Sequence, residues 1–187
     1  MGVQIRESTI EEIEDKLAEM TTPLNKISYL ESALREGGFS FEIKRFIWGN
    51  LVGLYEERKM YEKAGRAMAS KAGAEVTAKE KIESYLKAGE LFAKGGKIED
   101  ADDMFVRASR DGDSEDKAKV RLARKNIFVI NAQELEKQGK KVAATRFYEK
   151  LIKMNLLDEE KETIKERLIE IYRATGRFKD VALLEGL

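Results

Sequence analysis

The chain has 187 residues, of which 42% are apolar and 37% charged, and its 35 lysines and arginines balance 35 aspartates and glutamates. With one proline, this composition predicts a single helical domain over residues 1–187 and argues against a disordered chain, while the charge balance removes any bulk attraction to nucleic acid or an anionic membrane. Because cysteine and histidine are both absent, disulfides, thiolate nucleophiles, imidazole bases and zinc sites built from these ligands are excluded.

Helix start and stop signals occur along the whole chain. Ser8 followed by Glu11, and Thr77 followed by Glu80, are capping-box patterns. Further N-caps are expected at Ser40, Ser114 and Asp158, and glycines mark helix ends at Gly37-Gly38, Gly95-Gly96, Gly139 and Gly176. These signals predict ten helices, over about 8–20, 23–36, 41–58, 61–73, 78–94, 98–109, 115–138, 140–154, 159–175 and a short last one from 178.

The predicted helices repeat at a regular spacing. Counted from Gly96, Gly89 stands seven residues before, Phe92 four before, Ala101 five after and Phe105 nine after. Similar offsets recur around residues 21, 59, 139 and 176, so the five repeat centres are separated by 38, 37, 43 and 37 residues. Each repeat is then a helix, a short turn and a second helix, in which small residues let paired helices approach and large residues fill the gap to the next pair.

This pattern resembles the tetratricopeptide repeat. The residues that carry the resemblance are Gly89, Phe92, Gly96, Ala101, Phe105 and Ala108, and, in the preceding unit, Trp48, Leu51, Tyr55, Tyr61 and Ala64. The resemblance covers most of residues 41–182, although Lys59 stands where a turn glycine is usual. The period exceeds the 34 residues of the standard repeat and is more similar to the stretched repeats of the soluble NSF attachment protein type. The resemblance implies an all-α fold, an α-solenoid of about five stacked helical hairpins in a right-handed superhelix, over about 8–36, 41–73, 78–109, 115–154 and 159–187.

The resemblance also implies a partner groove lined by the first helix of each hairpin. Residues six before the repeat centres face this groove in the family, which here gives Gly53, Glu90, Gln133 and Glu170, with Gly49 one turn before Gly53. Each mid-helix glycine costs roughly 0.5–1 kcal/mol relative to alanine. Two explanations for Gly49 and Gly53 remain open: a neighbouring helix packs closely on them, or they form the floor of a groove in which a partner's backbone lies close.

Two further surfaces are candidates for binding. One helix face is expected to carry four cations, Lys117, Arg121, Arg124 and Lys125. This face is either solvated or attracts RNA or an acidic partner. The last helix is short and apolar, and Phe178, Val181, Leu183 and Leu184 predict self-association as a homodimer.

No motif of a catalytic or ligand site stands out. Gly95-Gly96 lacks the G-x-x-x-x-G-K-[ST] spacing and follows a helix, so we expect a turn there. In DGDSED, residues 111–116, Asp116 stands where a calcium loop needs glycine and Leu122 where it needs glutamate, so a solvated loop is favoured over a metal site. We therefore expect no enzymatic activity, metal, cofactor or small-molecule substrate.

Composition also bears on the setting of the protein. The acidic amino-terminal sequence MGVQIRESTIEEIED has no apolar core, and no window approaches eighteen apolar residues, so we expect no signal peptide or membrane span and a cytoplasmic location by default. Few Asn and Gln with abundant Lys and Glu fit a thermophilic protein. The expected function is a non-catalytic protein–protein interaction scaffold or adaptor that self-associates; the alternative is an RNA- or ribosome-associated factor that uses the basic face at 117–125.

Overall fold

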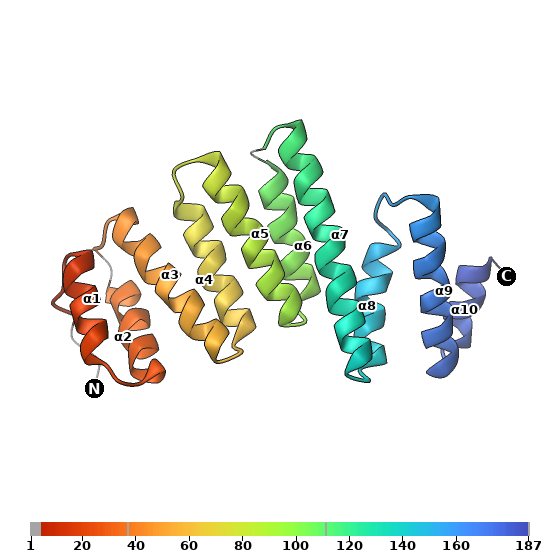
Figure 1. Ribbon diagram of the computed structural model, residues 1–187, viewed down its shortest axis with the longest axis horizontal. Coiled ribbons are helices and arrows are strands. Elements are labelled where there is room, and N and C mark those ends of the chain that lie inside the picture. The colour runs from red at the N-terminus through yellow and green to blue at the C-terminus, as the bar shows by residue number, and fades with distance from the viewer. Residues whose placement is uncertain (1–4, 37, 111, 187) are drawn as a thin grey trace. The chain divides into compact units, whose positions relative to one another are not determined.

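The structure, a computed structural model, describes residues 5–36, 38–110 and 112–186. Within these ranges the chain forms ten α-helices and no strand, as the sequence predicts (Figure 1). The helices are α1 (Ile10–Glu19), α2 (Pro23–Glu36), α3 (Phe41–Glu57), α4 (Tyr61–Ala74), α5 (Ala78–Lys94), α6 (Ile98–Arg110), α7 (Ser114–Lys137), α8 (Lys141–Leu151), α9 (Asp158–Ala174) and α10 (Phe178–Glu185).

The expected helix starts at α3 and α5 are confirmed. The Thr77 hydroxyl accepts a hydrogen bond from the Glu80 N–H at 3.2 Å, and the Glu80 carboxylate accepts one from the Thr77 N–H at 3.1 Å. The Ser40 hydroxyl accepts from the Ile43 N–H at 3.3 Å. Both side chains thus satisfy backbone donors that the first helical turn leaves without an intrahelical partner.

Three other predicted starts are displaced by one residue. The capping box of α1 joins Thr9 to Glu12, and not Ser8 to Glu11. At α7 the cap is the Asp113 carboxylate, which accepts from the N–H groups of Glu115 and Asp116 at 2.8 and 2.9 Å, so Ser114 is already helical. Asp158 likewise lies inside α9, after the cap position. At α1 and α7 two oxygen-bearing side chains are adjacent, and spacing alone does not decide which of them caps the helix.

Four of the five repeat centres share one turn geometry. Lys59, Gly96, Gly139 and Gly176 have left-handed φ angles of 56°, 72°, 74° and 74°, whereas Thr21 does not share this conformation. After each of the four, the next N–H donates to the carbonyl four residues before the centre at 2.8 Å; the pairs are Met60 to Tyr55, Lys97 to Phe92, Lys140 to Leu135 and Arg177 to Tyr172. This is the Schellman arrangement of a helix end. The spacing found in the sequence is therefore the spacing of a recurring helix–turn–helix element.

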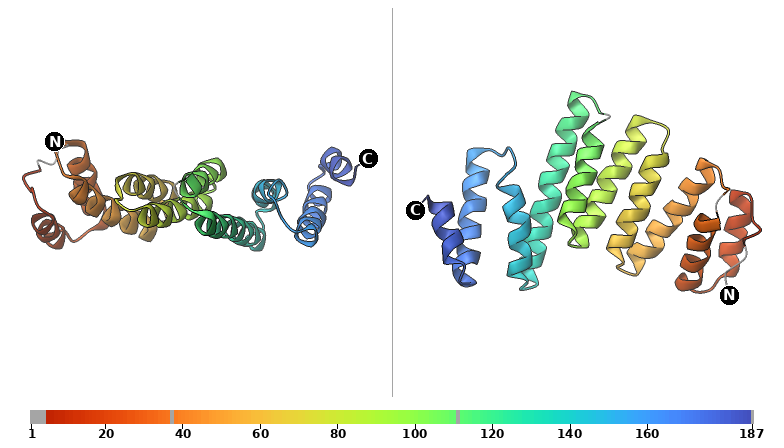
Figure 2. Two further views of the ribbon diagram at one scale, coloured as in Figure 1. Left: turned by 90° about the horizontal axis from the view of Figure 1, so that it is seen from above. Right: turned by 180° about the vertical axis from the view of Figure 1, so that it is seen from behind.

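The chain divides into two compact units, with the boundary between Val120 and Arg121, inside α7. In the first unit α2 packs on α3, α3 on α4, α4 on α5, and α5 on α6, and the two views of Figure 2 show α3 to α6 side by side. In the second unit α8 packs on α9, and α9 on α10. The single domain and the solenoid expected from the sequence stay predictions.

Small residues bring the helices of the first unit together. A Cβ atom added at Gly89 of α5 would lie 2.5 Å from the Phe105 ring of α6, and one added at Gly65 of α4 would lie 2.9 Å from the Phe92 ring of α5. Real Cβ atoms do not approach this closely, so both glycines are required by packing. A buried cluster from α1 to α5 forms the core of this unit; its largest members include Ile13, Tyr29, Leu30, Ile47 and Leu91.

The second unit has its own core. Phe128 of α7 meets Phe147 of α8 edge to face, with ring centroids 5.7 Å apart and planes inclined at 67°, and both rings are buried. Leu168 and Ile171 of α9 are also buried, as is Val181 of α10. No helix in the described part of the chain combines the length and apolarity that a bilayer span requires.

Candidate functional site

The groove residues expected from the sequence lie on the first helix of successive hairpins. Gly49 and Gly53 are on α3, Glu90 on α5, Gln133 on α7 and Glu170 on α9. Four of these five line two clefts, one in each compact unit. We refer to the cleft that contains the two glycines as cleft A and to the cleft that contains Gln133 and Glu170 as cleft B.

Cleft A runs along α3 and has a volume of about 510 Å³. Gly49 and Gly53 form its floor one helical turn apart, and the rest of its lining is Arg45, Phe46, Asn50, Leu54, Glu57, Lys71 and Glu75. A Cβ atom added at Gly53 would meet nothing within 4 Å, and one added at Gly49 would meet the Lys71 Cε atom at 3.9 Å, an ordinary contact. Close packing of a neighbouring helix therefore does not explain these glycines, and both of them line cleft A.

A buried carboxylate holds one end of cleft A together. Glu75, at the end of α4, is 9% exposed and accepts from the Lys71 Nζ atom at 2.6 Å and from the Ser84 hydroxyl at 3.3 Å. The Arg45 Nε atom lies 3.9 Å from Glu75, and Arg45 also donates to the Ala74 carbonyl at 3.3 Å. A buried charge is tolerated only with such partners, so this network fixes the two cations at the edge of the cleft.

Cleft B lies between α7 and α9 and has a volume of about 640 Å³. Its apolar lining comes from Val129, Ile164 and Leu156, and Gln133 and Thr163 add polar groups. Two cations, Lys125 and Arg167, face four carboxylates, Glu136, Glu160, Glu166 and Glu170. The cleft is therefore acidic on balance.

Two ion pairs connect the walls of cleft B. Lys125 of α7 donates to Glu160 of α9 at 2.6 Å, and Arg167 of α9 binds Glu136 of α7 through its Nε atom at 2.9 and 3.0 Å. The hydrogen bonds from Arg167 lower the pKa of Glu136, and burial, with the hydrogen bond to Glu136, raises the pKa of Tyr148 to about 12. Glu136 is thus a carboxylate and Tyr148 a neutral phenol at neutral pH.

Glu90 is placed differently from the other expected groove residues. It is partly buried on α5 and forms ion pairs with Lys94 at 2.5 Å and with Lys87 at 3.6 Å. Burial acts to raise the pKa of Glu90, but the two lysines outweigh it and the pKa lies below its ordinary value. Glu90 therefore belongs to an ion-pair cluster.

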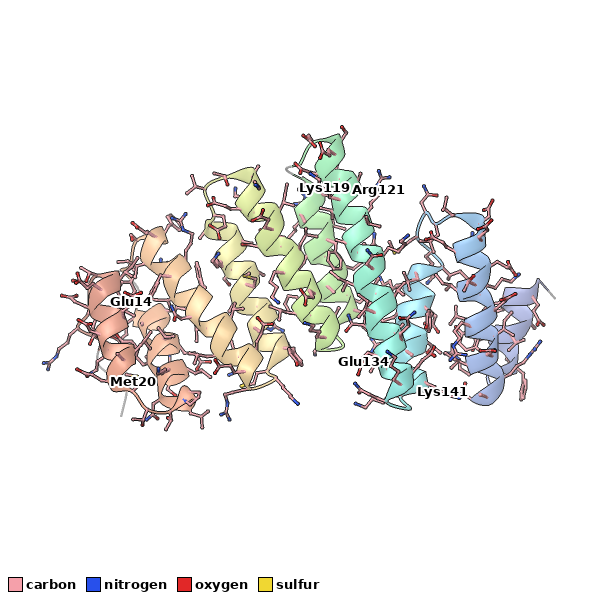
Figure 3. The ribbon with its side chains drawn as sticks, in the orientation of Figure 1. Glu14, Met20, Lys119, Arg121, Glu134 and Lys141 are labelled. Carbon is pink, nitrogen blue, oxygen red and sulfur yellow. The ribbon has the colours of Figure 1, made fainter. Side chains whose placement is uncertain are left out.

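The expected basic face on α7 is partly used inside the protein. Lys125 is paired with Glu160, and Arg124 is partly buried with its guanidinium 6.0 Å from the centre of the Phe128 ring. Lys117 and Arg121 are exposed, and Figure 3 shows Arg121 on the N-terminal half of α7. The four cations expected to act together therefore differ in their availability to a partner.

The apolar surface expected on α10 needs a correction. Val181 is 7% exposed and belongs to the core, so it is not part of an exposed surface for self-association. Phe178 and Leu183 are 68% and 77% exposed, and Leu184 is partly buried. Since residues five apart point about 140° from each other on a helix, Phe178 and Leu183 do not form one apolar face.

The sequence did not identify three components of these clefts. Glu75, Tyr148 and the Arg167 to Glu136 pair depend on contacts between separate helices, and the two members of that pair are 31 residues apart in the chain. A buried carboxylate at a helix end, as at Glu75, leaves a weak signal because charged residues at helix ends are common.

The acidic loop before α7 has a structural role. Asp113 caps this helix, while Asp111 lies outside the described residues. Among the residues that are described, no group of three or more His, Cys, Asp or Glu side chains is arranged to hold a metal ion.

Comparisons of the chain with family models, with curated proteins and with solved structures found no match. The clefts and their chemistry are therefore the basis for assigning a function.

Proposed function

We propose that this protein is a non-catalytic protein-binding module, built from tetratricopeptide-like hairpins that stack as a solenoid, and that it holds segments of a partner protein in clefts A and B. One observation carries the proposal. Positions defined only by their distance from the repeat turns, Gly53, Gln133 and Glu170, line clefts in two separate units of the chain. A repeated position that repeatedly lines a cleft is what a binding surface made of repeats requires.

The glycines of cleft A leave the backbone of α3 accessible to a partner. Gly49 and Gly53 each reduce the stability of α3 by roughly 0.5–1 kcal/mol relative to alanine, and no neighbouring group needs the space. Alanine would make α3 more stable at both positions. A partner whose backbone or flat side chain lies directly against α3 explains why the side chains are missing.

The chemistry of cleft B favours a partner with basic side chains. Lys125 pairs with Glu160, and Arg167 pairs with both Glu136 and Glu170, so two cations face four carboxylates and the cleft keeps a negative balance. The apolar strip formed by Val129, Ile164 and Leu156 would cover the aliphatic part of a lysine or arginine. Such a mixture of apolar area and surrounding charge is typical of protein interfaces.

The protonation of cleft B also supports a binding role in preference to catalysis. A general acid needs a carboxyl group whose pKa is raised, whereas the pKa of Glu136 is lowered by Arg167. The RNA-associated alternative gains no specific support from α7, since Lys125 is paired and Arg124 is partly buried. Self-association through α10 stays a prediction.

A pair of glycine substitutions tests the proposal. The tagged protein is used to recover partners from a lysate of its native source, and the recovered proteins are compared between Gly53→Leu and Gly73→Leu. Gly73 of α4 is a matched control because it is also exposed, helical and free of neighbours within 4 Å, but it does not line cleft A. We expect Gly53→Leu to reduce recovery of the partner about ten-fold or more, and Gly73→Leu to leave it unchanged. Equal recovery with both variants would contradict binding in cleft A.

A further inference from the structure

A third cleft, cleft C, lies in the first unit among α2, α3 and α4 and has a volume of about 400 Å³. Leu34, Trp48, Leu51 and Ala67 are its apolar members. Trp48 and Gly53 are five residues apart on α3, so they point about 140° from each other. Cleft C therefore opens on a different side of α3 from cleft A and is not part of the proposed groove.

The apolar floor of cleft C is fixed by the core. Leu51 and Ala67 are 2% and 7% exposed, and Leu34 and Trp48 are partly buried and pack against the same core cluster. A site whose side chains are held in this way loses little conformational entropy when a ligand binds. The indole of Trp48 offers a large apolar contact at such a site.

Cations dominate the rim of cleft C. Arg35, Lys63 and Arg66 face one carboxylate, Glu31. That carboxylate is already engaged, because it accepts from the Tyr55 hydroxyl at 2.6 Å and from the Lys63 Nζ atom at 3.2 Å. The rim that remains for a ligand is defined by the two arginines.

Both arginines have carboxylates nearby, since Glu31 acts on Arg35 and Asp100 acts on Arg66, but Glu31 is also paired with Lys63. Arg35 donates to the neutral Ser32 hydroxyl at 2.8 Å. Arg66 pairs with Glu62 at 2.9 Å, but Glu62 also accepts from Lys97 at 3.1 Å, so one carboxylate serves two cations. Both arginines are exposed and can present their guanidinium groups to a carboxylate in the bidentate geometry that Arg favours.

We propose that cleft C binds a protein segment in which an apolar side chain is flanked by carboxylates. The apolar side chain would lie on Trp48 and Leu51, and the carboxylates would bind Arg35 and Arg66. Tryptophan and arginine are the residues most enriched at the energetic centres of protein interfaces. A single-stranded nucleic acid fits less well, because its bases would meet a floor that is largely aliphatic. Cleft C thus selects the opposite charge from cleft B.

The chain carries its own reporter for a test, since Trp48 is its one tryptophan. The probe is a blocked peptide with leucine and phenylalanine at its centre and two glutamates on each side, and the control peptide has lysines in place of the glutamates. Tryptophan emission of the full chain is titrated with each peptide, for the wild type, for Arg35→Gln with Arg66→Gln, and for Arg58→Gln with Arg110→Gln. The last pair removes the same charge from exposed positions outside cleft C. Circular dichroism verifies that each variant is folded.

We expect the acidic peptide to change the emission saturably, to bind about ten-fold or more weakly to the Arg35 and Arg66 variant, and to bind the control variant as it binds the wild type. The lysine peptide should give no saturable change. No saturation with the acidic peptide, equal binding of the lysine peptide, or equal loss in both variants would overturn the proposal. Saturation by single-stranded RNA in place of the acidic peptide would assign cleft C to nucleic acid and would also overturn it. Gly53→Leu, which tests cleft A, should leave this titration unchanged, so the two proposals fail separately.

Discussion

The helical glycines of the first unit allow a sharp prediction, because the structure divides them into two kinds. At Gly53 an added Cβ atom meets nothing within 4 Å, so Gly53→Ala should raise the free energy of unfolding by about 0.5–1 kcal/mol through helix propensity alone. At Gly89 the added atom would lie 2.5 Å from the ring of Phe105, which is 1% exposed. Gly89→Ala should therefore lower the free energy of unfolding by about 1–3 kcal/mol, the usual cost of overpacking a core.

Urea denaturation followed by the emission of Trp48 measures both effects, since this tryptophan lies in the same unit as the two glycines. With a urea dependence of about 1–3 kcal/mol per molar, Gly53→Ala should move the midpoint upward by roughly 0.2–1 M, and Gly89→Ala should move it downward by more. Gly73→Ala, at another open helical position, should behave like Gly53→Ala. A stabilised Gly89→Ala or a destabilised Gly53→Ala would refute the distinction between packed and open helical glycines.

Three further predictions concern the turns, the ion pairs and the last helix. Lys59→Gly should stabilise the chain by up to about 1 kcal/mol in the same urea assay. A left-handed φ costs lysine about 1–2 kcal/mol, and the greater freedom of glycine in the unfolded chain partly offsets the gain from removing this strain. A urea midpoint below that of the wild type would be inconsistent with the strain. The hydrogen bond from Tyr55 lowers the pKa of Glu31 in the folded chain. Its contribution to stability is therefore fully present above the pKa of about 4.3 that Glu31 has in the unfolded chain, and it is lost as the pH falls through the lower pKa of the folded state. Tyr55→Phe should therefore reduce the free energy of unfolding at pH 7, and this free energy should fall less on acidification than it does in the wild type. Parallel profiles of unfolding free energy against pH would argue against the coupling between Tyr55 and Glu31. If the chain self-associates through α10, Leu183→Ser should lower the mass measured by light scattering at high concentration, and an unchanged mass would remove α10 as the interface.

The helices and turns could be predicted from the sequence because their signals are local. Thr77 with Glu80 fixes the start of α5, and the turn glycines at 96, 139 and 176 are required by a left-handed backbone. Lys59 shows the strength of the repeat, since it adopts the same conformation without being glycine. The spacing of the repeat therefore predicted a backbone geometry that residue preference alone would have missed.

The clefts were predictable only in part. Position within the repeat identified Gly53, Gln133 and Glu170, because the same offset from three of the four left-handed turns places a residue at a cleft; from the turn at Gly96 it gives Glu90, which lines neither cleft A nor cleft B. The pairing of Lys125 with Glu160 could not be predicted, since it joins side chains 35 residues apart on different helices. The burial of Val181 was missed for a similar reason, because a short apolar helix can bury one residue against its neighbour while exposing the others.

Photo-crosslinking at the rims of clefts A and B tests the central claim most directly. A benzophenone amino acid is placed at Glu57, on the rim of cleft A, at Glu166, on the rim of cleft B, and at Glu83, an exposed control on α5 outside both clefts. If the protein is a protein-binding module, irradiation in a lysate of the native source should give discrete protein adducts from positions 57 and 166 and none from position 83. The adduct at position 57 should be lost when Gly53→Leu is also present. Adducts that are no more abundant at positions 57 and 166 than at position 83 would contradict the account.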